Sequence, residues 1–470
     1  MCSKLNPSLK PTSKFEEERL AGGYGALAAK QSNIALLRRL VLANMLWEDV
    51  AYCDGKSIAE EIKRLVPLCS AEDVYTVALA ARTLQKLRHT PLFLASEMCK
   101  YPEHRLFVKD LLPKIITRAD MLTDFLAIYW KEGKKPVANQ AKKGLAEAFH
   151  NFNAYKFAKY DRNAAIKLRD VMFLTHPKPR DEKETELFKM VAERTLPVPE
   201  TWETMLSAGK DKKETWTKLI TENKIGGLAF LRNLRNMREA NVDKKVIKYG
   251  FETLKSSMLM PMNFLQAAKM NPEFERDIED AMLAAYSNLP KIPGKTLFIL
   301  DASGSMWSRV SWKSELSRYS AAKAMAMLAA NQCADFELVV TAGNDSARVH
   351  KSEIIQYPSK GFNLLKQIDE VQGRLGGGGI FTRQCLEWCK EQFPDTEFDR
   401  IIIFSDSQDC DYPNKRTPRP FGKHNYICDV SAEKHGINYR GIWDAEISGF
   451  SEYFLTFIAA YEGIENRFDE

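Results

Sequence analysis

The fold of this chain is decided by the stretch Thr296-Leu297-Phe298-Ile299-Leu300-Asp301-Ala302-Ser303-Gly304-Ser305-Met306. Five mostly apolar residues lead directly into an acid and two hydroxyl groups at alternate positions. Such an apolar run before a polar turn is typical of a central strand in a parallel sheet. Ligands of these sheets collect beyond the carboxyl ends of the strands, where alternate spacing lets Asp301, Ser303 and Ser305 converge. A carboxylate and neutral hydroxyls suit a hard divalent cation such as Mg²⁺.

Two later segments complete this pattern. A loop of four glycines, 376–379, comes shortly before Thr382 and an expected helix. A second apolar strand, Ile401–Phe404, then runs into Asp406, which has a serine on each side. The alternative is that Asp301 and its serines only cap the helix that follows. The occurrence of all three elements in this order favours a metal site.

This ordered set resembles the metal-ion-dependent adhesion site of von Willebrand factor A domains. That family has Asp-x-Ser-x-Ser, then a Thr from a Gly-Gly loop, then an Asp after a later strand. Four residues of this sequence match that family pattern position by position: Asp301, Ser303, Ser305 and Asp406. Ile380 stands where Thr normally follows the glycines, so the nearest hydroxyl lies two residues later. The resemblance implies an α/β Rossmann-like domain with a Mg²⁺ site, whose ligands are Asp301, Ser303, Ser305, Asp406 and Thr382.

Length and composition indicate an intracellular globular protein. The 470 residues suffice for two or three domains, and 45% hydrophobic with 28% charged residues is unlike a disordered chain. No apolar run approaches the roughly 20 residues needed to cross a membrane, and the N-terminus lacks the apolar core of a signal peptide. The nine cysteines are scattered and form no Cys-x-x-Cys pair. We therefore expect a cytoplasmic protein without a membrane partner.

Charge is distributed unevenly along the chain. Residues 1–290 carry 47 Lys and Arg against 37 Asp and Glu, whereas residues 291–470 carry 21 against 25. The basic part is therefore the part without the metal motif. A positive field attracts polyanions such as nucleic acid, although charge alone does not identify the partner.

The basic part is predicted to be helical. Residues 1–14 are polar and contain proline, which predicts a flexible arm. Residues 15–290 read as amphipathic helices separated by short breaks, many of them at prolines. Helix pairs with short connections favour an α-solenoid, in which each pair buries its apolar face on its neighbours. The predicted domains are the arm, a helical-repeat domain over 15–290, and the A-like domain over 291–470.

Basic residues gather in two segments of this helical part. The window Tyr155–Arg180 holds seven cations and only two acids, with three aromatic residues among the first cations. Cations one helical turn apart are able to meet successive phosphates, and exposed aromatics stack on unpaired bases. The alternative is a solvated helix face whose aromatics point into the core. With the arginines of Leu228–Arg238, the candidate RNA contacts are Lys156, Lys159, Arg162, Lys167, Arg169, His176, Lys178, Arg180, Arg232 and Arg235. A smaller group of similar character is formed by Arg82, Lys86 and Arg88.

The combination of a helical-repeat domain, these basic stretches and an A-like domain resembles the TROVE family, which contains the Ro autoantigen and its bacterial and phage relatives. The resemblance implies HEAT-like repeats closed into a ring, with the A domain bridging its ends. It also implies small non-coding Y RNAs on the basic outer surface, and single-stranded ends of misfolded RNA in the central hole. Lys159 and His176 match two family positions that contribute to Y RNA binding. The third, an Arg, falls on Asn163, directly after Arg162.

The resemblance further implies a non-catalytic ribonucleoprotein for RNA quality control or stabilisation, monomeric and, in bacteria, tethered to an exoribonuclease. The sequence agrees, because no Walker lysine follows glycines 376–379 and Ser303, not a second Asp, lies two residues after Asp301. Two alternatives remain. One is a metal-dependent protein-interaction scaffold whose A domain recruits a partner carboxylate, and the other is a metal-dependent hydrolase.

Overall fold

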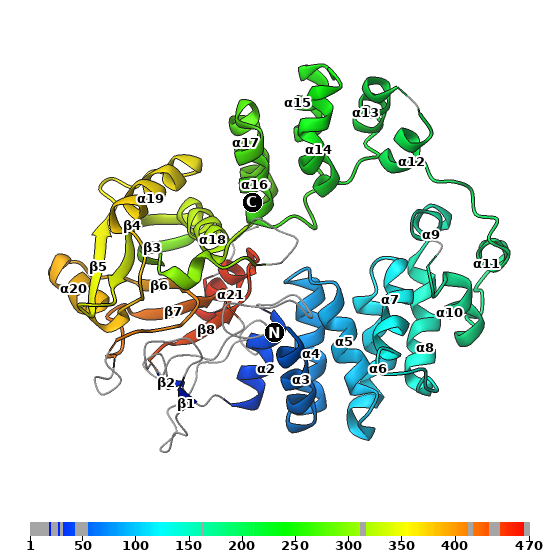
Figure 1. Cartoon of the computed structure of the whole chain (residues 1–470), viewed down its shortest axis with the longest axis horizontal. Helices are drawn as coiled ribbons and strands as arrows, with labels where there is room; N and C mark the ends of the chain where they lie inside the picture. The colour runs from blue at the N-terminus through cyan, green and yellow to red at the C-terminus, as the bar shows by residue number, and fades with distance from the viewer. Residues whose placement is uncertain are drawn as a thin grey trace. The chain divides into compact units, whose positions relative to one another are not determined.

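The computed structural model describes residues 18–19, 27–28, 32–42, 55–161, 164–209, 211–310, 316–411, 417–431 and 442–464. The predicted arm at 1–14 and the candidate Arg162 lie outside these residues. The chain forms two compact units (Figure 1). One comprises Met1–Glu61 together with Leu259–Glu470, and the other comprises Ile62–Met258.

The unit Ile62–Met258 is helical. After α3 (Gly55–Leu65), in which its boundary falls, its helices are α4 (Ala71–Thr83), α5 (His89–Met98), α6 (Pro102–Ile115), α7 (Asp120–Tyr129), α8 (Asn139–Ala148), α9 (Ala154–Tyr160), α10 (Leu168–Thr175), α11 (Glu182–Glu193), α12 (Trp202–Ser207), α13 (Lys212–Thr221), α14 (Gly227–Glu239) and α15 (Lys244–Glu252). Many begin at a polar cap; for example, Ser70 Oγ accepts a hydrogen bond from Asp73 N at 3.1 Å.

Alternate helices of this unit pack on one another (Figure 1). Helix α6 packs between α4 and α8, while α5 packs on α7. Helices α8 and α6 approach closely at Gly144, where a Cβ would lie 3.0 Å from the carbonyl oxygens of Val108 and Lys109. The prediction that this part of the chain is helical is confirmed, and packing between alternate helices is also found in α-solenoids.

The other unit is built on a six-stranded sheet with the order β5-β4-β3-β6-β7-β8. Its strands are β3 (Ile292–Asp301), β4 (Cys333–Asn344), β5 (Val349–Ile354), β6 (Arg400–Ser405), β7 (His424–Asp429) and β8 (Ala445–Ser448). Neighbouring strands are parallel, except that β5 runs antiparallel to β4. The two predicted strands lie side by side in β3 and β6, in register from Thr296 opposite Arg400.

Helices cover both faces of this sheet. They are α18 (Arg318–Gln332), α19 (Phe362–Leu375), α20 (Thr382–Gln392) and α21 (Tyr453–Tyr461), to which the unit adds α2 (Asn33–Leu42), α16 (Pro261–Met270) and α17 (Glu275–Ala285). A separate antiparallel pair is formed by β1 (Glu18–Arg19) and β2 (Leu27–Ala28).

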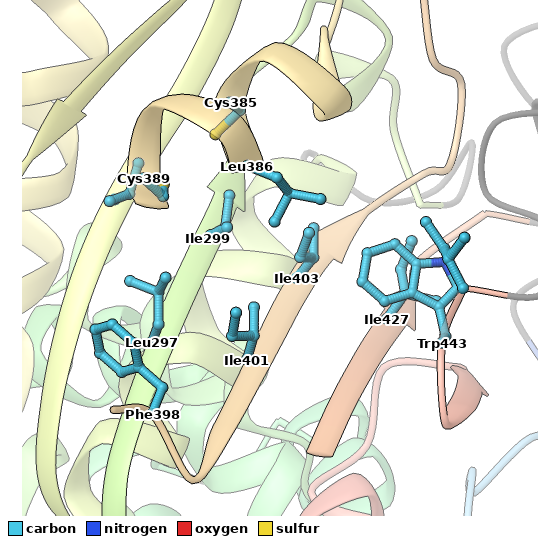
Figure 2. Close-up of a cluster of buried hydrophobic side chains, with 12 residues drawn as sticks. Leu297, Ile299, Cys385, Leu386, Cys389, Phe398, Ile401, Ile403, Ile427 and Trp443 are labelled. Carbon is cyan, nitrogen blue, oxygen red and sulfur yellow. The ribbon is translucent and has the colours of Figure 1, made fainter. Parts of the chain in front are cut away.

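Helix α20 lies over one face, where Cys385, Leu386 and Cys389 pack on Leu297, Ile299 and their neighbours in β6 and β7 (Figure 2). The residues of β3 that alternate with Leu297 and Ile299, such as Phe298, point to the other face of the sheet. There Phe298 lies beside Phe404 of β6, which packs on Phe454 of α21.

The predicted boundary at residue 290 falls between α17 and β3. By their contacts, however, α16 and α17 belong with the sheet: α16 packs on α18, and Glu279 Oε1 of α17 accepts a hydrogen bond from Phe362 N at 2.8 Å.

Candidate functional site

The predicted metal motif lies at the carboxyl end of β3, where the chain order of the strands reverses. The strand that follows β3 in the chain pairs on one side of it, and β6 pairs on the other. Such a switch point leaves a crevice in which ligands of open α/β sheets bind. Asp301 ends β3, Asp406 follows β6 directly, and both side chains are fully buried.

Hydrogen bonds orient both oxygens of the Asp301 carboxylate. Ser303 N donates to Oδ1 at 2.8 Å, and Ser405 Oγ donates to Oδ2 at 2.6 Å. The hydroxyls of Ser303 and Ser305 lie 3.4 Å apart. The alternate spacing of the motif therefore does bring its polar groups to one place, as the sequence predicts.

The glycine-rich loop lies directly beside this turn. Gly304 N donates to Gly378 O at 2.7 Å. Gly378 has φ +100°, and a Cβ there would lie 2.2 Å from Gly343 O at the end of β4, so no other residue fits without moving the backbone. Further along the loop, Thr382 begins α20 and is buried, and its amide donates to Asp409 Oδ1 at 3.1 Å. All three predicted segments thus meet at this edge of the sheet.

The motif residues fit a hard cation. In an octahedral Mg²⁺ site each oxygen lies about 2.1 Å from the ion, so two neighbouring oxygens are about 3 Å apart. The two serine hydroxyls have a similar separation. Burial, together with the neighbouring Asp406 carboxylate, raises the pKa of Asp301 to about 7. A divalent cation relieves this repulsion between two buried carboxylates. In the described part of the chain no group of three or more His, Cys, Asp or Glu is arranged to hold a metal, so a cation here would depend on the serine hydroxyls.

Two buried arginines adjoin the site, and neither is suggested by the sequence. Arg318 of α18 places Nη1 3.4 Å from Asp406 Oδ2. Arg39 of α2 places Nη1 2.9 Å from Asp429 Oδ2 at the end of β7, and its Nη2 donates to Asp406 O at 3.1 Å. Asp301, Asp406 and Asp429 are all fully buried, and the two guanidiniums contact Asp406 and Asp429.

The first group of candidate RNA contacts lies on and after α9. Lys156 is exposed, and its Nζ donates to Asn151 O at 3.4 Å. Lys159 is half-buried with Nζ 5.7 Å from the centroid of the Tyr160 ring, and burial lowers its pKa. Of the aromatics in this window, Phe157 packs in the core, as the alternative reading expects, whereas Tyr155 is 43% exposed.

The second group lies around α10. Lys167 and Arg169, at its start, are half-exposed. His176 ends the helix as an exposed residue in the left-handed conformation, with φ 48°. Lys178 is exposed, and Arg180 is exposed in an ion pair with Glu147.

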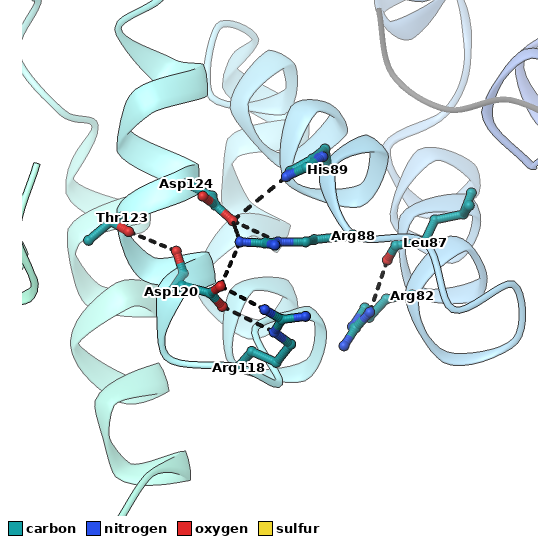
Figure 3. Close-up of polar contacts among 8 residues, drawn as sticks. All are labelled: Arg82, Leu87, Arg88, His89, Arg118, Asp120, Thr123 and Asp124. Carbon is teal, nitrogen blue, oxygen red and sulfur yellow. Dashed lines mark hydrogen bonds and ion pairs between the residues drawn. The ribbon is translucent and has the colours of Figure 1, made fainter. Parts of the chain in front are cut away.

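The α14 candidates differ from each other. Both Arg232 and Arg235 are exposed, but Arg235 Nε lies 2.8 Å from Glu239 Oε1. Of the smaller basic group, Arg88 forms a network with Arg118, Asp120 and Asp124, whereas Arg82 lies near it and bonds Leu87 O (Figure 3). The sequence did not single out Arg118, because it stands alone between α6 and α7 without a basic run around it.

Comparison with known proteins gives two matches. The family model of the TROVE domain matches residues 189–342. This span includes Arg232, Arg235 and the Asp301 motif, but not the candidate contacts at 156–180. The structure is similar to the crystal structure of the Ro (RSR) protein of Deinococcus radiodurans, with a TM-score of 0.59 and 17% sequence identity over 92% of this chain and 100% of that chain.

Comparison with curated protein sequences gives no match. In the described residues, no helix is both long and apolar enough to cross a membrane. The chain therefore shares its fold with a bacterial Ro protein and carries a TROVE-like segment at residues 189–342.

Proposed function

We propose that this protein is a non-catalytic RNA-binding protein. The observation that carries the proposal is the coincidence of a TROVE-like segment and a Ro-like fold with a basic helical region. Among the described residues, the exposed side chains of Lys156, His176, Lys178 and Arg232 form no ion pair with an acid. Such cations are available to neutralise phosphates and release counterions.

The RNA that we propose is of two kinds. A small structured, Y-like RNA binds a basic outer surface, and single-stranded ends of misfolded RNA enter a central hole of a ring closed by the A-like domain. The biological role is RNA quality control or stabilisation in the cytoplasm, by a monomer that also engages an exoribonuclease. The match of Lys159 and His176 to the family pattern, and the exposure of His176, support the first part of this proposal.

The A-like domain holds Mg²⁺ in this proposal. Asp301, Ser303, Ser305, Asp406 and Thr382 would provide the oxygen ligands. When bound, the ion supplies positive charge to the buried carboxylates. Of these residues only Ser305 is partly exposed, which favours a structural ion over one that recruits a partner carboxylate. The protein-interaction scaffold is therefore the weaker candidate.

Salt-dependent RNA affinity tests the central proposal. The dissociation constant for a labelled RNA hairpin with a single-stranded tail is measured between 50 and 200 mM salt. If four to six phosphates are neutralised, affinity falls by about 10²- to 10³-fold over this range. A flat salt dependence, or no RNA at 260 nm in protein purified under low salt, would contradict RNA binding. Sequencing the co-purified RNA identifies the natural ligand.

Replacement of a metal ligand tests the second part. Asp301→Asn should abolish the rise in melting temperature that Mg²⁺ gives the wild-type protein, which is worth about 2.7 kcal/mol at a concentration 100 times the Kd. RNA affinity should change little. A collapse of RNA binding in this variant would show instead that the metal site supports the RNA surface.

A further inference from the structure

The helical unit holds a second group of cations that the sequence comparison does not assign. We propose that Arg118 and Arg88, together with Lys159, bind a backbone phosphate of RNA at the end of α9 and the start of α7. This inference rests on the proposed RNA-binding function and extends the surface that binds RNA onto the turn between α6 and α7.

The arginines are held in a shared network (Figure 3). Arg88 Nη2 lies 2.7 Å from Asp120 Oδ2 and 2.6 Å from Asp124 Oδ2. Arg118 reaches the same Asp120 with Nε at 3.2 Å and Nη2 at 2.8 Å. The two acids thereby fix the direction of two guanidinium groups. A fixed guanidinium loses little freedom when it binds a phosphate.

The guanidinium of Arg82 adds a third positive charge close to this network. Arg82 is buried, and its partners are the Thr117 hydroxyl, with Nε at 2.9 Å, and the Leu87 carbonyl, with Nη1 at 3.2 Å. Burial and the nearby Arg118 and Arg88 charges lower the pKa of Arg82 to about 10. Arg82 therefore adds a positive charge near the two paired arginines, and an anion would relieve their mutual repulsion.

Helix α9 adds to this charge. Arg118 Cζ lies 4.7 Å from the centroid of the Tyr160 ring, and Lys159 Nζ lies 5.7 Å from the same centroid. Burial lowers the pKa of Lys159; Arg118 and Lys255 act in the same direction, whereas Glu203 and Asp120 oppose them. Lys159 and Arg118 thus lie near the same Tyr160 ring, which links the predicted window on α9 to this network.

The network also keeps donors toward solvent. The side chains of Arg88 and Arg118 are 33% and 37% exposed. Within the described residues, their Nη1 atoms take part in no hydrogen bond. Arg82, in contrast, uses all three nitrogens inside the protein. The Nη1 group of each arginine is therefore available to donate a charge-assisted hydrogen bond to a phosphate oxygen.

The test compares two substitutions in the full chain, one that removes a positive charge and one that removes a negative charge. The probe is the labelled RNA hairpin with a single-stranded tail. Arg118→Gln should weaken binding about tenfold and reduce the slope of log affinity against log salt by about 0.7 to 0.9. Asp124→Asn keeps an acceptor for Arg88 but removes a negative charge, so it should strengthen binding. Arg374→Gln, which breaks an exposed ion pair with Glu353 in the sheet unit, is the control and should change neither quantity.

The signs of these effects separate the explanations. If the network is purely structural, Asp124→Asn should lower the melting temperature and should weaken RNA binding or leave it unchanged. That result, obtained with folded protein, would overturn the phosphate site. Wild-type affinity and slope in Arg118→Gln would also overturn it. In both cases wild-type protein still binds the probe, and the proposed function stands. Failure of the wild-type protein to bind RNA would overturn both proposals.

Discussion

Arg39 Nη1 lies 2.9 Å from Asp429 Oδ2, and both side chains are almost completely excluded from solvent. The arginine comes from α2 near the start of the chain, and the aspartate ends β7. This pair joins the N-terminal helix to the edge of the sheet that carries the candidate metal motif. Loss of one partner leaves a buried charge without compensation, which costs more than the pair itself contributes.

Arg39→Met should therefore destabilise the sheet unit by about 3 to 5 kcal/mol at pH 8, measured by chemical unfolding. The control is Arg419→Gln, which removes an exposed partner of Asp444 and should cost less than about 1 kcal/mol. Equal effects of the two substitutions would show that the Arg39 pair adds nothing to stability.

Stability should depend on pH through Asp429. Burial raises the pKa of this carboxyl to about 7, against the opposing effect of Arg39. A carboxyl whose folded pKa lies above its unfolded value binds more protons in the folded state, so stability falls as pH rises from about 4 to 7 and then levels off. The slope from one such group is at most about 1.4 kcal/mol per pH unit. Asp429→Asn should reduce the slope of this part of the profile in urea unfolding, although Asp301, whose pKa is also raised, still contributes to it. An unchanged profile would refute the assignment.

The glycine-rich loop should tolerate alanine at one position and reject it at the next. Gly378→Ala forces a Cβ onto Gly343 O at φ +100°, so it should destabilise the protein by at least about 2 kcal/mol and weaken Mg²⁺ binding. Gly377→Ala meets no atom within 4 Å and is the matched control. Calorimetric Mg²⁺ titration and thermal unfolding of both variants measure the difference. Similar behaviour of the two would mean that the loop does not hold the site together.

His176 should contribute to binding of structured RNA. His176→Asn preserves the left-handed end of α10, because asparagine adopts this conformation readily, and removes the imidazole. We expect weaker binding of an RNA hairpin by about 1 kcal/mol, with a smaller change for a single-stranded oligonucleotide. Arg374→Gln, which breaks an exposed ion pair with Glu353 in the sheet unit, serves as control. Equal losses for both RNAs would show that this surface is wrongly assigned.

Local sequence patterns were enough to predict much of the sheet unit. The apolar run before Asp301 and the similar run at Ile401–Phe404 predicted two central strands, which lie side by side as β3 and β6. The order of the turn residues predicted which loops would meet, because parallel strands end at one edge of a sheet. The helical nature of residues 62–258 likewise followed from apolar periodicity and caps such as Ser70.

Only the tertiary structure decided which charges act together. Arg39 and Arg318 reach the motif from helices remote from it in sequence, and Arg118 joins Arg88 only because α5 packs on α7. It also decided that Phe157 is buried while Tyr155 is exposed. The periodicity of apolar residues predicts which side of a helix is apolar. Whether a charge is buried or paired depends instead on neighbours from distant parts of the chain.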